Sequence, residues 1–115
     1  MACHTRGVVD CGVVVNPAGI VQQIESGIVY GLGPALKHGI TLDKGRVTNT
    51  NFNSYDPTRI DETPQIEVHI VPSTANPGGA GEASTPATPP AVFNAIYAAT
   101  KKRIRMLPAK AADLA

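Results

Sequence analysis

A glycine-rich stretch bounded by prolines constrains the fold of this chain more than any other segment. It reads Pro77-Gly-Gly-Ala-Gly-Glu82, and further prolines follow at positions 86, 89 and 90. Glycine is unfavourable inside helices and strands, and proline stiffens the chain on either side. The pattern predicts a loop between two ordered elements, with the acid Glu82 at its end.

Glu82 has two interpretations. A carboxylate on a crowded and stiffened backbone is a candidate general base. The alternative is a solvated acid on a surface loop, because Gly and Pro most often only mark a turn of the chain. Taken alone, the residues of this loop favour the alternative.

Composition bounds the kind of protein. With 115 residues, the chain forms at most one domain, residues 1–115. A hydrophobic share of 43% allows a core, while 11 glycines and 10 prolines predict much loop. The net charge is +1, and the basic residues cluster only near 101–105. This charge gives no reason to expect nucleic acid as a partner.

Cysteine content and hydropathy exclude other classes. Cys3 and Cys11 are too few for a disulfide framework, and with His4 they are too few for a metal site. We therefore expect no metal ligands among them, and we expect Cys11 to be a small buried residue. No run reaches the roughly 18–20 apolar residues of a membrane span. Residues 1–10 lack the apolar run of a signal peptide, so the compartment, cytoplasmic or periplasmic, is not assigned.

The first half of the chain predicts a strand and a long helix. Residues 7–15 are rich in valine and predict a buried strand. Asn16-Pro17 is a helix start, and apolar residues then recur every fourth position, which predicts a helix over 17–37. Glycines interrupt this helix at positions 27, 31 and 33, and each costs roughly 1 kcal/mol relative to alanine. Either another backbone or a ligand comes close there, or the helix ends near Gly31.

The second half predicts smaller elements and a second helix. Residues 40–48 predict a hairpin with a turn at Asp43-Lys44-Gly45, residues 49–63 a loop, and residues 66–71 a half-buried strand. On that strand Glu67 and His69 are expected to be ordinary polar residues on the solvent side or at a pocket rim. A helix over 89–103 follows, capped by Thr88, with a buried stripe of Val92, Phe93, Ile96 and Ala99. These elements predict an α+β fold, with two main helices packed on a small mixed or antiparallel sheet.

Three common catalytic motifs are absent. The chain has no Gly-x-Ser-x-Gly elbow of the hydrolases. Gly31 and Gly33 lack the third glycine of a dinucleotide fingerprint, and the 78–82 loop lacks the Gly-Lys ending of a P-loop.

Four segments together resemble a known family. They are 9–17 (VDCGVVVNP), 23–32 (QIESGIVYGL), 78–82 (GGAGE) and 89–96 (PPAVFNAI). In this order and spacing, over about residues 8–108, they resemble the C-terminal end of the molybdopterin-binding large subunit of the xanthine dehydrogenase and aldehyde oxidase superfamily. The similarity points in particular to the isoquinoline 1-oxidoreductase β-subunit and to related bacterial aldehyde dehydrogenase subunits.

The resemblance implies a function. Such enzymes are molybdenum hydroxylases, which oxidise aldehydes or N-heterocycles with water as the oxygen source. It implies that Glu82 is the general base, that Gln23 hydrogen-bonds near the metal, and that Gly81 passes close to the cofactor. The implied cofactor of the complete enzyme is molybdopterin cytosine dinucleotide. The implied partners are the remaining part of the large subunit, an iron–sulfur subunit and a small-molecule substrate.

Two departures from the family qualify this expectation. Ala83 stands where members usually have proline, which puts the rigidity of the base in doubt. The several hundred residues that precede this part of the family's large subunit are also missing, so we expect the isolated chain to be an inactive fragment without cofactor. Its uncovered apolar surface is expected to form a homodimer. The alternatives are a stand-alone, non-catalytic binding or structural module, and a domain that binds anions through the amides of 78–81.

Overall fold

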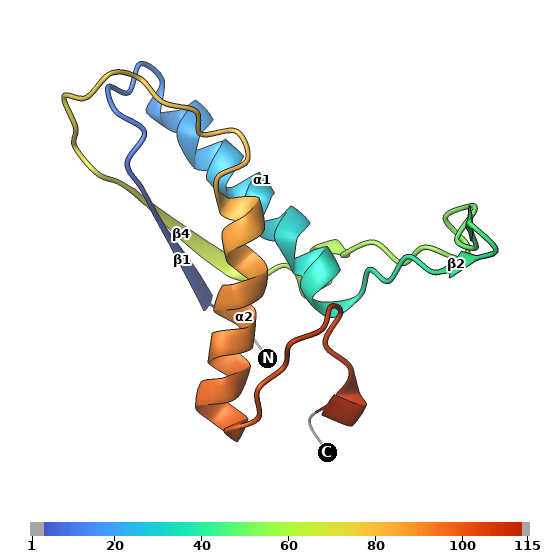
Figure 1. The fold of residues 1–115 in the computed structure, drawn as a ribbon. Helices are drawn as coiled ribbons and strands as arrows, with labels where there is room; N and C mark the ends of the chain where they lie inside the picture. The colour runs from blue at the N-terminus through green and yellow to red at the C-terminus, as the bar shows by residue number, and fades with distance from the viewer. Residues whose placement is uncertain (1–3, 114–115) are drawn as a thin grey trace.

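The computed structural model describes residues 4–113 and confirms the predicted α+β class. Two helices cross each other, and a pair of strands lies along one side of them (Figure 1). The elements in chain order are β1 (His4–Val9), α1 (Pro17–Leu36), β2 (Leu42–Asp43), β3 (Arg46–Val47), the 3-10 turn η1 (Ile60–Glu62), β4 (Gln65–Ile70), α2 (Ser84–Thr100) and the 3-10 turn η2 (Ala111–Asp113).

The principal sheet consists of β1 and β4, which pair in parallel from His4 opposite Gln65 to Val9 opposite Ile70. Parallel neighbours need a long crossover, and α1 lies within it. One face of the sheet packs on α1, because a side chain at Gly7 would meet the side chains of Ile24 and Ile28. The expected sheet was mixed or antiparallel. Both kinds of pairing occur, but the antiparallel pair, β2 with β3, forms a separate sheet.

The first strand is shorter than predicted. The buried strand expected over 7–15 is a half-buried strand over His4–Val9, and a turn follows it. The Asp10 carboxylate accepts a hydrogen bond from the Gly12 amide at 3.0 Å, and Gly12 has a φ of 74°. This turn ends the strand, because glycine alone adopts that backbone conformation without strain. Cys11 is buried as predicted, whereas Cys3 lies outside the described residues.

Helix α1 confirms the predicted start. The Asn16 side chain accepts a hydrogen bond from the Gly19 amide at 3.2 Å, and Pro17 occupies the first turn. The helix continues to Leu36, so the alternative that it ends near Gly31 is wrong.

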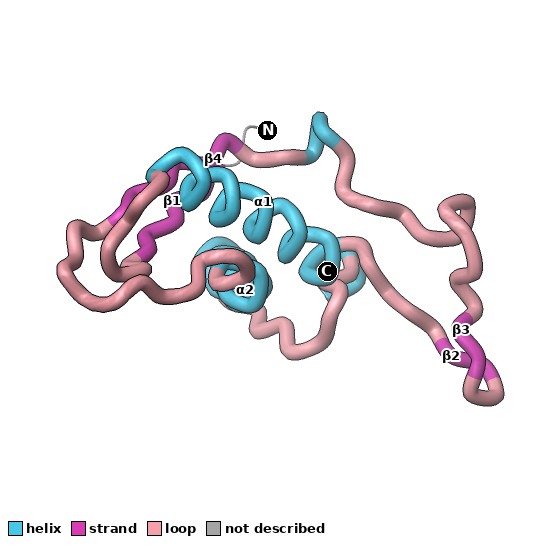
Figure 2. Tube along the Cα trace, turned by 90° about the horizontal axis from the view of Figure 1, so that it is seen from above, coloured by secondary structure: helices cyan, strands magenta, loops and turns pink. Residues whose placement is uncertain are grey.

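The interior glycines of α1 allow close packing of α2. A Cβ at Gly31 would lie 2.7 Å from the Thr85 carbonyl oxygen and 2.7 Å from Thr88 Cβ. A Cβ at Gly27, one turn earlier, would meet Ser84 and Thr85. The first turn of α2 therefore rests directly on the α1 backbone, and Figure 2 shows α2 nearly end-on beside α1. The expected close approach of another backbone is confirmed.

Helix α2 begins five residues earlier than the predicted 89. Thr88 is not its cap but a buried residue inside it, and its hydroxyl donates to the Ser84 carbonyl at 2.8 Å. The expected buried stripe is also incomplete. Val92, Phe93 and Ile96 are half-buried, and Ala99 is exposed. Nothing in residues 4–113 covers this side of the helix fully, although the pattern is apolar.

Residues 40–62 form an arm that projects away from the helices in both views (Figures 1 and 2). The predicted hairpin at its tip is confirmed, with Lys44 and Gly45 both at positive φ. The base of the arm is fastened to the end of α1. Lys37 Nζ lies 2.9 Å from a carboxylate oxygen of Asp56 and of Glu62, which lowers the pKa of both acids and raises that of Lys37.

Candidate functional site

The glycine-rich loop is fastened at both ends. At its start, the Gly78 amide donates to the Cys11 carbonyl at 2.8 Å, which ties the loop to the turn after β1. At its end, the Thr85 amide donates to the Glu82 carbonyl at 3.1 Å, which ties it to the first turn of α2. Ala80 is buried between them. The loop is thus an ordered connection from β4 to α2, and it passes across α1 in Figure 1.

On one side of this loop, no other part of residues 4–113 covers the backbone at Gly79 and Gly81. A Cβ added at Gly79 or at Gly81 would meet nothing within 4 Å. Both glycines are exposed, and the Glu82 side chain beside them is exposed as well. An uncovered backbone next to a carboxylate leaves room for a bulky group to come close, which fits an organic cofactor. Residues 4–113 contain no cluster of metal-ligating side chains.

The structure brings the segments of the three predicted site residues to one place. Ser84, two residues after Glu82, donates its hydroxyl hydrogen to the carbonyl of Ile24 at 2.9 Å. Ile24 follows Gln23 directly on α1, and Gln23 is exposed. Gly81, Glu82 and Gln23 therefore belong to two stretches that touch where the helices cross. Their roles toward a cofactor stay predictions.

The polar face of the sheet is a separate cluster. Glu67 pairs with Arg6 at 2.9 Å and with His69 at 2.8 Å, and the Arg6 guanidinium lowers the pKa of Glu67. His69 is exposed and Glu67 half-exposed. This arrangement agrees with the interpretation of both residues as solvent-side groups.

Comparison with known proteins decides the family. The sequence model of the molybdopterin cofactor-binding domain matches residues 3–64, more than half of the chain. The chain belongs to the molybdopterin cofactor-binding family. This confirms the resemblance to the molybdopterin-binding subunits of the xanthine dehydrogenase and aldehyde oxidase superfamily.

Two curated relatives match nearly all of the chain. A membrane-bound aldehyde dehydrogenase (pyrroloquinoline-quinone) of Gluconacetobacter polyoxogenes is 38% identical over 106 residues, covering 92% of this chain and 14% of the relative. The isoquinoline 1-oxidoreductase subunit beta of Brevundimonas diminuta is 34% identical over 104 residues, covering 90% of this chain and 13% of the relative. The chain thus spans about one seventh of the length of the first and a similar share of the second.

Solved structures show the same arrangement. Quinoline 2-oxidoreductase from Pseudomonas putida 86 matches with a TM-score of 0.80 and 26% identity, over 90% of this chain and 14% of that one. CO dehydrogenase from Oligotropha carboxidovorans matches in fold with a TM-score of 0.79 at 24% identity, over 95% of this chain and 15% of that one. The fold of this family member therefore matches a part of each of these two longer chains.

Sequence reasoning missed one contact of the site in this molybdopterin cofactor-binding chain. The hydrogen bond from Ser84 to α1 joins residues 60 positions apart. A signal was present, because Gly27 and Gly31 have the spacing that lets two helices approach closely, and Ser84 and Thr85 are small polar residues suited to such a contact. The sequence did not indicate which segment packs against these glycines; the structure shows that it is the first turn of α2.

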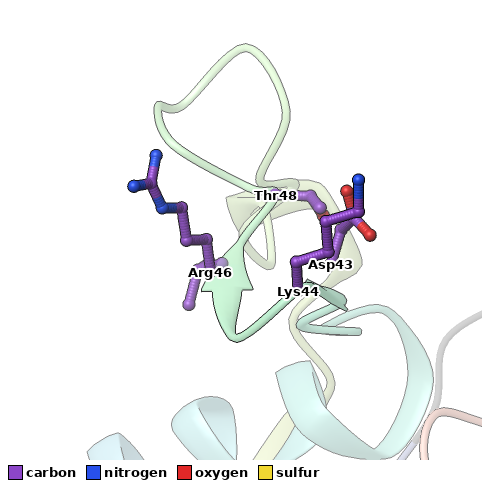
Figure 3. A pocket seen from close by; sticks show the side chains of 5 residues that line it. Asp43, Lys44, Arg46 and Thr48 are labelled. Carbon is purple, nitrogen blue, oxygen red and sulfur yellow. The ribbon is translucent and has the colours of Figure 1, made fainter.

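A hollow beside the hairpin lies on the arm, away from the glycine-rich loop. Asp43, Lys44, Arg46, Val47 and Thr48 line it. Figure 3 shows Arg46 pointing away from Lys44 and Asp43, so the charged groups do not converge on one point. None of the predicted site residues takes part in this hollow.

Within residues 4–113, no helix is long and apolar enough to cross a membrane.

Proposed function

We propose that residues 1–115 are the C-terminal segment of the large subunit of a molybdenum hydroxylase, with Glu82 as its general base. The observation that carries this proposal is the bare side of the 78–82 loop, which ends on an exposed carboxylate in a chain of the molybdopterin cofactor-binding family. A general base must be able to reach its proton, and Glu82 is exposed on an ordered loop.

Each residue of the site has a distinct part in this proposal. In the net reaction the substrate carbon exchanges a bond to hydrogen for a bond to an oxygen from water, with release of protons and an electron pair. When bound, the molybdopterin cofactor supplies the redox-active centre that accepts those electrons. The Glu82 carboxylate accepts a proton during oxygen transfer. Gly81 leaves the backbone bare for the cofactor, and the Gln23 amide donates a hydrogen bond near the metal.

Substrate and partners follow from the same proposal. The relatives are named for an aldehyde, for isoquinoline and, in Pseudomonas putida, for nicotinate, so an aldehyde or an N-heterocycle is the proposed substrate class. Several relatives are named as subunits, which supports a partner chain, and we propose an iron–sulfur subunit as the acceptor of the electrons. The proposed form of the cofactor is molybdopterin cytosine dinucleotide.

Cofactor analysis of the complete enzyme tests this proposal. The purified enzyme is expected to contain molybdenum in near-equal molar amount to the large subunit, and acid hydrolysis is expected to release cytidine monophosphate. The name of the Gluconacetobacter relative makes pyrroloquinoline quinone the competing cofactor. An enzyme that contains this quinone and no molybdenum would contradict the proposal.

The isolated chain is proposed to be inactive, free of cofactor and dimeric. Large apolar side chains are exposed over the whole molecule, including Val15, Tyr30, Phe52 and Ile60, with exposed fractions of 70–93%. Apolar surface of this kind favours association. Sedimentation equilibrium is expected to show a dimer at micromolar concentration, with binding of a hydrophobic dye. A metal-free monomer without dye binding would instead favour a stand-alone, non-catalytic module.

A further inference from the structure

We propose that Ser84 is a positioning residue, whose hydrogen bond to α1 holds the Glu82 carboxylate in place for catalysis. This inference rests on the proposed function of Glu82. The Ser84 hydroxyl donates to the Ile24 carbonyl at 2.9 Å, and Ile24 is a buried residue of α1. A carbonyl oxygen has two lone pairs, so Ile24 accepts this bond beside its bond within the helix.

Residues of both helices contribute to the contact between Ser84 and α1. A Cβ at Gly27 would meet the Ser84 hydroxyl, so the glycine leaves the space that Ser84 occupies. The next residue, Thr85, donates its amide hydrogen to the Glu82 carbonyl at 3.1 Å. A continuous series of contacts thus runs from the α1 backbone through Ser84 and Thr85 to the backbone of Glu82.

No side-chain cap fixes the start of α2. The residue at the cap position is Ala83, which has no side chain that could accept a hydrogen bond from the first turn. An uncapped helix start has backbone amides without partners inside the helix and frays easily. The bond from Ser84 to α1 satisfies none of these amides, but it holds the first turn of α2 against a second helix.

The backbone of Ala83 offers a second way to hold the loop. Its φ is −56°, within the range that a proline ring adopts. Proline at this position would restrict the loop next to Glu82 without using the Ser84 hydroxyl. Ala83→Pro is therefore a rescue variant for loss of the hydrogen bond, and it leaves the chemistry of Glu82 unchanged.

The experiment uses the complete, cofactor-loaded enzyme. Ser84→Ala is expected to lower kcat by about 10–100-fold, the effect of a small misplacement of a catalytic group, with KM and molybdenum content nearly unchanged. Adding Ala83→Pro is expected to restore most of the lost kcat. The matched control is Thr100→Ala at the other end of α2, which removes the bond from the Thr100 hydroxyl to the Ile96 carbonyl at 2.8 Å and the bond from the Lys102 amide to that hydroxyl at 3.2 Å. Its kcat is expected to stay at the wild-type value.

The outcomes separate this inference from the proposed function. Wild-type kcat in Ser84→Ala overturns it. The inference is also overturned if Ala83→Pro does not restore the kcat lost in Ser84→Ala and Thr100→Ala loses as much kcat. The effect would then be general destabilisation. In a Glu82→Gln background, Ser84→Ala is expected to have no further effect on kcat. If Glu82→Gln keeps full turnover, the role of Glu82 fails first. If Glu82→Gln is inactive while Ser84→Ala is normal, only the inference about Ser84 fails.

Discussion

Glu82→Gln in the complete enzyme is expected to reduce turnover by about 10²–10⁴-fold, the usual effect of losing an acid–base group. The substitution nearly preserves the size of the side chain and removes the charge that accepts a proton. Molybdenum content is expected to stay near the wild-type value, because the proposed cofactor holds the metal and Glu82 does not. Turnover and molybdenum should be measured on the same preparation.

The control for this prediction is Glu25→Gln, the same change elsewhere in the chain. Glu25 lies on α1 and lines a hollow with Thr63 and Pro64, on the side that faces the start of β4. Its turnover is expected to equal that of the wild type. Normal turnover in Glu82→Gln would refute the role of Glu82 as the base. Loss of molybdenum together with turnover would make Glu82 a structural residue of the cofactor pocket.

Gly31→Ala is expected to separate α2 from α1. The new Cβ would lie 2.7 Å from both the Thr85 carbonyl oxygen and Thr88 Cβ, and a backbone atom cannot move aside cheaply. Overpacking of this kind costs about 1–3 kcal/mol, more than the roughly 0.5–1 kcal/mol that alanine gains over glycine inside a helix. Hydrogen exchange of the α2 amides in the complete subunit is expected to quicken accordingly.

Gly19→Ala is the matched control, because it makes the same change in the first turn of the same helix. The added Cβ would lie 3.4 Å from the Asn16 side chain, an ordinary contact distance, and its three nearest neighbours would all be atoms of that side chain. Exchange of the α2 amides is expected to stay unchanged. If Gly31→Ala behaved like Gly19→Ala, the close packing of the two helices at Gly31 would be wrong.

Local signals in the sequence determined where several elements lie. Asn16-Pro17 marked the start of α1, because a side-chain cap and a preset φ act within one turn. Lys44-Gly45 marked the hairpin turn, and the alternating residues after 65 marked β4. The four family segments likewise indicated the family, since residue type and spacing are properties of the sequence itself. The same resemblance predicted Glu82, Gly81 and Gln23 as site residues.

Tertiary contacts decided the features that local signals placed wrongly or left open. The sequence favoured Thr88 as a helix cap, yet α2 begins at Ser84 because its first turn packs on Gly27 and Gly31 and bonds to Ile24. The two explanations for the α1 glycines could not be separated until that partner was known. Nor could any local pattern bring Ser84 and Ile24 together, because a contact between residues 60 positions apart depends on how the helices pack and not on the preferences of either segment.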